Sequence, residues 1–150
     1  ENSGELWQYD FESESSSKVI SVTIKDISYY QFNAQEDQFY YITEREGQIK
    51  KYDLKTGAID VLIGKIDSRD LDSWALAESG IYYIKRNKTE GDITFYNFTT
   101  KSETLIQPLP HNNYCYNTKL SVSNNGRFII YNTISHFESD VVLVRKMDKD

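Results

Sequence analysis

A strand-like segment that returns at a nearly constant interval constrains the fold of this chain more than any other feature. Its copies are Leu6–Phe11 (LWQYDF), Ile49–Leu54 (IKKYDL), Ile93–Phe98 (ITFYNF) and Val141–Lys146 (VVLVRK). Tyr9, Tyr52 and Tyr96 stand 43 and 44 residues apart, and Val144 takes the same position 48 residues further on. A repeat of this length, built from short strands, is typical of four-stranded blades that stack on one another.

A second apolar segment precedes each of the last three copies. It occurs as Gln38–Ile42 (QFYYI), Gly80–Ile84 (GIYYI) and Arg127–Tyr131 (RFIIY). Aligned in this way, Tyr40, Tyr82 and Ile129 fall on one face of the strand, with Tyr41 and Tyr83 on the other. Because large side chains occupy both faces, we expect each of these strands to be packed between two neighbouring sheets.

Short polar connections divide the chain into blocks at 1–26, 27–66, 67–110 and 111–150. The first block is predicted to hold strands Glu5–Phe11 and Lys18–Ile24, joined by a solvated turn at Glu12–Ser17. The second is predicted to hold Ser28–Asn33, Gln38–Thr43, Gln48–Leu54 and Ala58–Ile63. The third is predicted to hold Ser73–Ala77, Gly80–Lys85, Asp92–Phe98 and Glu103–Gln107, after which Pro108 and Pro110 end the sheet. The last is predicted to hold Leu120–Ser123, Arg127–Ile134 and Asp140–Arg145, with a tight turn at Asn124-Asn125-Gly126.

These blocks predict an all-β chain with about three four-stranded antiparallel blades of a β-propeller. A sandwich or another antiparallel sheet also has short strands, but it does not restart the same third strand at each repeat. Closed propellers contain about four to eight blades, so we expect this chain to be part of a larger propeller or to be completed by dimerisation. Lys18–Ile24 is the strand expected to close the ring, within one chain or between two. Two such halves would form a six-bladed toroid.

Composition argues against several classes of protein. The net charge is −6 and no block of basic residues exists, which disfavours direct contact with nucleic acid. The apolar runs are too short to cross a bilayer, and no signal peptide is visible. The start at Glu1 leads us to expect a segment of a longer protein.

The residues that could carry chemistry are few. His111 and His136 fall in predicted loops, and no G-x-S-x-G nucleophile motif accompanies them. Cys115 is predicted to be a packed apolar residue, with redox sensing as the alternative. The segment containing Asp67, Asp70 and Asp72 suggests calcium ligands, but it lacks the spacing and the glycine of an EF-hand, so a solvated loop is the preferred interpretation. We assign no catalytic, cofactor-binding or metal-binding residue.

Aromatic residues in loops are the candidates for an interaction surface, because aromatic side chains dominate binding hot spots. They are Tyr29, Tyr30, Tyr114, Tyr116 and Phe137. For the tyrosines within strands, packing between blades is the simpler interpretation.

The last two blocks resemble a known family. Trp74–Ala77, Gly80–Ile84 and Ile93–Phe98 are similar to the penultimate blade of TolB-like (WD-repeat-like) propellers. Leu120–Ser123, Gly126-Arg127, Tyr131 and Glu138–Val144 are similar to the terminal blade of that group. The resemblance covers about 71–146 well and 1–64 by repeat pattern alone. Ser123–Gly126 replaces the usual Ser-Pro-Asp-Gly, so Pro and Asp are missing while the turn-forming chemistry is kept.

Such propellers occur at the C-terminus of membrane-anchored winged-helix transcriptional regulators of the CadC/ToxR-like kind. The resemblance therefore implies a non-catalytic sensory or binding domain in the periplasm, which presents its loops to a protein or a small ligand. DNA contact and membrane anchoring would belong to segments before Glu1. Two alternatives stay open: a propeller that gates a serine hydrolase, and a TolB-like scaffold of the cell envelope.

Overall fold

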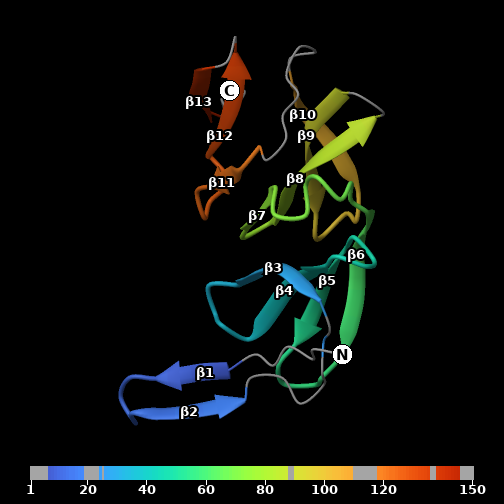
Figure 1. The fold of residues 1–150 in the computed structure, drawn as a ribbon. Helices are drawn as coiled ribbons and strands as arrows, with labels where there is room; N and C mark the ends of the chain where they lie inside the picture. The colour runs from blue at the N-terminus through green and yellow to red at the C-terminus, as the bar shows by residue number, and fades with distance from the viewer. Residues whose placement is uncertain are drawn as a thin grey trace.

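The computed structural model describes residues 7–18, 24, 26–87, 90–109, 118–135 and 138–145 (Figure 1). These residues form antiparallel strands, and no helix occurs among them. The strands are β1 (Trp7–Asp10), β2 (Ser15–Lys18), β3 (Ile27–Phe32), β4 (Gln38–Thr43), β5 (Gln48–Asp53), β6 (Ile59–Lys65), β7 (Trp74–Ala77), β8 (Gly80–Asn87), β9 (Glu90–Asn97), β10 (Glu103–Pro108), β11 (Leu120–Val122), β12 (Phe128–Ser135) and β13 (Glu138–Arg145). From β3 onward, every strand begins and ends within two residues of its predicted bounds.

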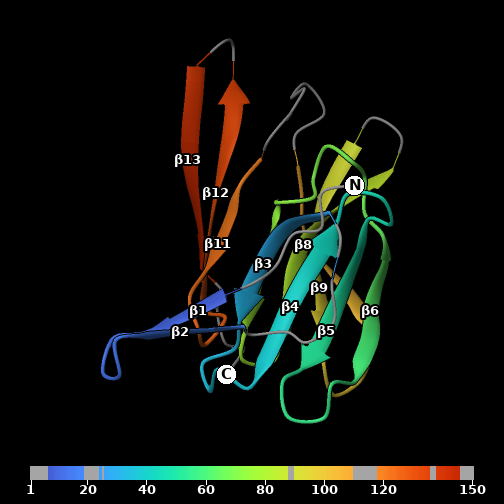
Figure 2. The same ribbon diagram turned by 60° about the horizontal axis from the view of Figure 1, so that its bottom comes forward.

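Each sheet is a meander of strands that are consecutive in sequence. The first sheet has the order β3-β4-β5-β6, the second β7-β8-β9-β10 and the third β11-β12-β13, while β1 and β2 form a separate hairpin. Figure 1 shows the sheets following one another in chain order, from the hairpin to the third sheet, and in the turned view of Figure 2 the first sheet lies in front of the second. The prediction of an all-β fold built from four-stranded antiparallel blades is confirmed.

The first interface between sheets is formed by side chains that alternate along the second strand of each sheet. In β4, Tyr40 and Ile42 pack against the second sheet. In β8, Ile81 and Tyr83 point back into the same cluster, which also contains Trp74. All of these side chains are buried. Because adjacent strand residues point to opposite faces, β4 and β8 each supply apolar residues to both of their faces.

A second interface joins the second and third sheets. Tyr82 and Ile84 of β8 pack with Ile129 and Tyr131 of β12, and Leu120 of β11 completes this group. The second sheet is therefore covered on both faces. Burial of this kind, rather than hydrogen bonding between sheets, supplies most of the stabilisation that holds propeller blades together.

The turns β1–β2, β5–β6 and β9–β10 repeat the same backbone geometry. A side-chain oxygen of Asp10, Asp53 or Asn97 accepts hydrogen bonds from the main-chain NH groups two and three residues further on. Four residues after each of these side chains, the backbone has a positive φ: 49° at Glu14, 73° at Gly57 and 55° at Lys101. The hairpin β1–β2 is therefore the structural equivalent of β5–β6 and β9–β10, as the spacing of Tyr9, Tyr52 and Tyr96 predicts.

The structure corrects one end of the solvated turn predicted at Glu12–Ser17: these residues are exposed, as predicted, but the last three of them belong to a strand. Ser15–Lys18 forms β2 and pairs with β1, from Trp7 opposite Lys18 to Asp10 opposite Ser15. Serine has a low intrinsic preference for strands, but the turn at Asp10 brings the two segments together and so overrides that preference. Lys18, predicted to begin a ring-closing strand, ends β2 instead. Of the rest of that predicted strand, 19–23 lie outside the described residues, and Ile24 packs against the first sheet.

The predicted alignment of the last block is also wrong by one residue. Ile129 points back toward the second sheet, whereas its supposed equivalents Tyr40 and Tyr82 point forward to the next sheet. The residue that matches Tyr40 and Tyr82 is Ile130, which pairs with Ser121 and Leu143. A slip of one residue in a strand exchanges its two faces, and RFIIY matched QFYYI in hydrophobicity at either alignment.

The turn between β11 and β12 follows the predicted chemistry. Gly126 has a φ of 68°, in the left-handed region that glycine adopts without strain. Ser123 closes the turn twice: its NH donates to the Phe128 carbonyl at 3.0 Å, and its hydroxyl accepts from the Phe128 NH at 3.0 Å. The predicted turn at Asn124-Asn125-Gly126 is confirmed.

The packing between sheets predicts a large effect of truncation at Ile81. Ile81→Ala removes a fully buried side chain from the first interface, and we expect it to lower the free energy of unfolding by about 2–5 kcal/mol. Ile59→Ala, on the outer strand β6, removes the same atoms from a largely exposed position, and we expect about 1 kcal/mol or less. Urea unfolding followed by circular dichroism measures both. Equal losses would show that the sheets do not depend on this interface.

Candidate functional site

A polar cleft of about 450 Å³ lies where the hairpin turns of the three sheets meet. The turn between β3 and β4 forms one wall, and the turn between β7 and β8 forms the other. A hydrogen bond from the Glu78 NH to the Asn124 carbonyl, 3.0 Å long, ties the second turn to the third. The lining residues are Gln31, Phe32, Asn33, Ala34, Gln35, Asp37, Gln38, Tyr40, Leu76, Ala77, Glu78, Phe98 and Asn124.

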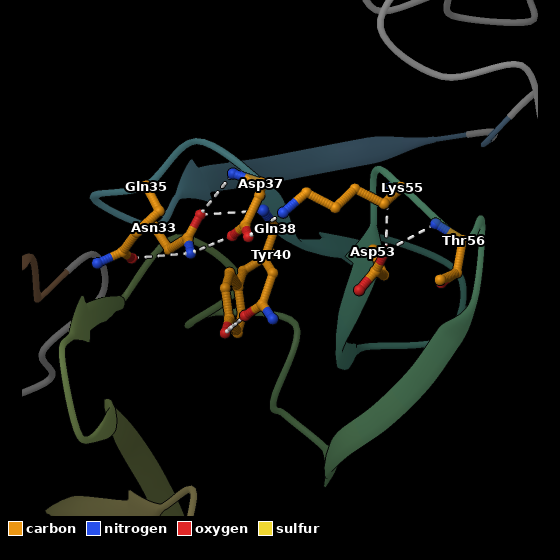
Figure 3. A network of polar contacts seen from close by, with 8 residues as sticks. All are labelled: Asn33, Gln35, Asp37, Gln38, Tyr40, Asp53, Lys55 and Thr56. Carbon is orange, nitrogen blue, oxygen red and sulfur yellow. Dashed lines mark hydrogen bonds and ion pairs between the residues drawn. The ribbon is translucent and has the colours of Figure 1, made fainter.

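Asn33 organises the wall of this cleft formed by the β3–β4 turn (Figure 3). Its side-chain oxygen accepts hydrogen bonds from the NH groups of Asp37 (3.1 Å) and Gln38 (3.0 Å). Its side-chain NH₂ group donates to a carboxylate oxygen of Asp37 at 2.8 Å. Lys55 reaches the other oxygen of that carboxylate at 3.2 Å. Bonds within the chain thus hold the turn in this conformation, and a binding wall held in this way lowers the entropic cost of binding.

Two groups at the cleft have altered pKa values. The Asn33 amide, helped by the Lys55 ammonium, lowers the pKa of Asp37, so this carboxyl is ionised at neutral pH. Burial raises the pKa of Tyr40 to about 12, and the negative charge of Asp37 adds to the effect. The Tyr40 hydroxyl donates to the side-chain oxygen of Gln38 at 2.7 Å. The cleft thus offers a carboxylate and amide groups, and its phenol stays protonated.

Gln31 connects the two sheets on either side of the cleft. Its side-chain NH₂ donates to the carbonyl of Trp74 at 3.3 Å, and its side-chain oxygen accepts from the NH of Leu76 at 2.8 Å. These bonds satisfy main-chain groups of β7, the first strand of the second sheet. The side chain therefore acts as a bridge between neighbouring sheets, and it is one of the residues that line the cleft.

The acidic segment after β6 is not the solvated loop that the sequence suggests. Asp70 is fully buried and forms a two-pronged ion pair with Arg86. Asp67 pairs with Arg69, which lowers the pKa of Asp67 to about 2, and Asp72 pairs with Lys119. Each carboxylate thus meets a basic side chain, and the fold brings two of these partners, Arg86 and Lys119, from distant parts of the sequence. Among the described residues, no group of three or more acidic, His or Cys side chains is placed to hold a metal ion.

Most of the predicted interaction surface lies outside the described residues, namely Tyr114, Tyr116 and Phe137. Tyr29 packs edge-on against Trp74 with ring centres 5.2 Å apart, so it contributes to the interface between sheets. Tyr30 is about half exposed on the opposite face of β3. Its binding role stays a prediction. His111, Cys115 and His136 also lie outside the described residues.

The residues that build the cleft were not singled out in the sequence, although a signal for them existed. Asn33 and Asp37 flank a predicted turn, and Asn and Asp are residues that bind neighbouring main-chain groups in turns. Nothing in the sequence indicated that Gln31 reaches the next sheet, because that contact spans more than forty residues.

The chain was compared with known proteins at three levels. No protein-family model matches it, and no curated protein matches it by sequence. Among solved structures it is similar to TolB from Acinetobacter baumannii, with a TM-score of 0.73 and 13% identity over 94% of this chain and 35% of that one. A nidogen/laminin complex gives a TM-score of 0.66 at 6% identity, over 92% of this chain and 52% of the other.

A third similar structure is the tricorn protease, with a TM-score of 0.61 and 14% identity over 86% of this chain and 13% of the protease. At such low identities the similarity establishes the architecture, a run of β-propeller blades. The chain spans about a third of the TolB chain that it matches. In the part of the chain that the structure describes, no helix has the length and apolar character needed to cross a membrane.

The bridge at Gln31 predicts a loss of stability on truncation. Gln31→Ala removes both cross-sheet hydrogen bonds and leaves main-chain groups of Trp74 and Leu76 without these partners, so we expect the free energy of unfolding to fall by about 1–3 kcal/mol. Gln35→Ala is the matched control, because among the described residues that exposed side chain bonds to Asn33 alone. Denaturant unfolding compares the two. A Gln31 variant as stable as the Gln35 variant would contradict the bridging role.

The raised pKa of Tyr40 predicts a change of stability at high pH. The folded pKa of about 12 lies above the ordinary value of 10.0. The group therefore contributes its full stabilisation below pH 10, and that contribution is lost as the pH rises toward 12. Tyr40→Phe removes this dependence, so its stability should fall less steeply than that of the natural chain over this interval. Parallel melting curves across the interval test the sign, and equal slopes would contradict it.

Proposed function

We propose that this chain is a non-catalytic binding and sensing segment of a β-propeller, and that its cleft at the turn end takes a small polar ligand or a segment of a partner protein. The observation that carries the proposal is the Asn33–Asp37–Lys55 network, which holds the wall of the cleft in one conformation. Pre-formed concave sites with a few fixed polar groups are the usual form of a binding site.

The chemistry of the lining favours binding over catalysis. The side chains that line the cleft supply amides, carboxylates and a protonated phenol. Several of these groups already bond to one another, as at Asn33 and Gln38. Such a set can form directional hydrogen bonds with a polar ligand. A nucleophile activated by a neighbouring base would need a different set.

We propose more specifically that this segment lies in the periplasm, as the C-terminal sensory domain of a membrane-anchored transcriptional regulator. Its support is the resemblance of Trp74–Phe98 and Leu120–Val144 to the last blades of such propellers. The net charge of −6 agrees with a segment that does not itself contact DNA. The sequence of the full-length protein tests this regulator assignment: it should contain a winged helix and one apolar stretch of about 20 residues before Glu1.

Two other functions have a specific observation in their favour. The similarity to a part of the tricorn protease favours a propeller that controls access to a hydrolase. The similarity to TolB favours a scaffold of the cell envelope. An α/β domain with a nucleophile elbow elsewhere in the full-length protein would support the first. A stable protein partner in the envelope, without any ligand in the cleft, would support the second.

A binding screen tests the cleft directly. The chain, labelled with ¹⁵N, is titrated at millimolar concentration with free amino acids, dipeptides and monosaccharides, and its amide resonances and melting temperature are recorded. We expect at least one compound to shift the resonances of 33–38 and to raise the melting temperature.

Matched substitutions locate the binding. Glu78→Ala removes an exposed carboxylate that lines the cleft, and it should change the affinity several-fold for that compound. Glu44→Ala removes an exposed carboxylate outside the cleft and should leave the affinity unchanged. Resonance shifts confined to residues away from the turns would contradict the assignment of the cleft as the binding site.

A further inference from the structure

Charged side chains of one sign line the cleft at the turn end. They are Asp37, on the wall formed by the β3–β4 turn, and Glu78, on the wall formed by the β7–β8 turn. No Lys, Arg or His occurs among the described residues that line the cleft. Because a concave site surrounded by low-dielectric protein concentrates the field of its charges, a cleft of this kind attracts ligands of the opposite sign.

Glu78 presents a carboxylate that the rest of the described chain does not use. Its main chain is held in place, since the Glu78 NH donates to the Asn124 carbonyl at 3.0 Å. Its side chain is exposed and forms no hydrogen bond or ion pair with another described residue. An ionised carboxylate can only accept hydrogen bonds, so a group that binds to it must donate them.

Asp37 keeps its charge and part of its capacity to accept hydrogen bonds. One carboxylate oxygen accepts from the Asn33 side-chain NH₂ at 2.8 Å, and the other is paired with Lys55 at 3.2 Å (Figure 3). These two contacts leave acceptor sites open, because a carboxylate has roughly four lone-pair sites. Lys55 is not one of the lining residues, and its side chain is 75% exposed, so water screens much of its charge.

Two aromatic rings in the lining favour the same kind of ligand. Tyr40 and Phe98 stack with ring centres 5.6 Å apart and an interplanar angle of 23°. The Phe98 NH donates to the Ser79 carbonyl at 3.0 Å, which places this partly exposed ring beside the β7–β8 turn that carries Glu78. The face of an aromatic ring attracts a cation through the ring quadrupole. The carboxylates and the aromatic rings therefore both suit a cation.

We propose that the ligand of this cleft carries a positive charge on a group rich in N–H donors, namely an ammonium or a guanidinium. This inference rests on the binding function proposed above and adds the chemical class of the ligand. Such groups donate hydrogen bonds and accept none, so they match the carboxylates on both walls. A free amine and a Lys or Arg side chain of a partner protein share this chemistry.

Two probes of equal shape test the charge. N-acetyl-arginine amide carries a guanidinium, and N-acetyl-citrulline amide carries a neutral urea in its place. Each is titrated into the ¹⁵N-labelled chain while the amide resonances of 33–38 and of Glu78 are followed. We expect the arginine probe to bind about fivefold more tightly or better, which is the ratio that one solvent-exposed charge pair supplies. Its affinity should fall as NaCl is added, whereas that of the citrulline probe should not.

An isosteric substitution assigns the effect to the cleft. Glu78→Gln keeps the shape of the side chain and removes its charge, so it should weaken binding of the arginine probe about fivefold and change binding of the citrulline probe less than about twofold. Glu44→Gln removes an exposed carboxylate outside the cleft and should leave both affinities unchanged. Circular dichroism verifies that both variants are folded.

The outcomes separate the charge of the ligand from the binding role of the cleft. Equal affinities of the two probes at 33–38, or an unchanged affinity of Glu78→Gln for the arginine probe, would overturn the positive charge and leave the binding role standing. A neutral compound that shifts these resonances while the arginine probe does not would have the same consequence. Resonances that no compound shifts would overturn both.

A short peptide distinguishes the two sources of the cation. A Gly-Ser-Arg-Ser-Gly peptide with blocked ends carries the same guanidinium on an extended main chain. If it binds more tightly than the arginine probe and loses that affinity in Glu78→Gln, the cation belongs to a segment of a partner protein. Equal affinities of the peptide and the arginine probe, both reduced in Glu78→Gln, indicate a small free amine.

Discussion

The stacking of one sheet face on the next is the contact on which the rest of this structure depends. A four-stranded sheet with Tyr and Ile on both faces cannot bury them alone, because each of its faces needs an apolar neighbour. The second sheet has such a neighbour on both sides, and its residues Trp74, Ile81, Ile84 and Ile93 are almost completely buried. The positions of the turns and of the cleft between them follow from this stacking.

Hydrogen bonds and ion pairs add to the apolar contacts that hold the sheets together. Gln31 binds main-chain groups of the neighbouring sheet, and the ion pair between Asp70 and Arg86 is enclosed by the protein. A buried ion pair adds little net stability, because the removal of two charges from water offsets much of their attraction. At the turn end, Asn33 holds the wall of the cleft without a contribution from any ligand. The binding function proposed here rests on that rigidity.

Sequence patterns were a reliable guide where local chemistry decides the structure. Asp10, Asp53 and Asn97 begin identical turns because their side chains bond to main-chain groups only two and three residues away. Sequence patterns were a poor guide where two alignments of a strand are equally apolar. Ile129 and Ile130 are the same amino acid, so only the packing of the folded chain shows that Ile129 faces the second sheet. Ser15–Ser17 misled the prediction for a related reason, since a strand there depends on its partner and not on its own residues.

The sequence by itself determined that the chain is a series of small antiparallel sheets, because alternation along each strand and the spacing of the repeats are properties of neighbouring residues. It also placed nearly every strand from Ile27 onward. Only the tertiary structure decided which face of each strand meets which sheet, that Asp70 is buried against Arg86, and that Gln31 crosses to the next sheet. Those contacts join residues that are far apart in the chain, and no local pattern encodes which distant partner a side chain will meet.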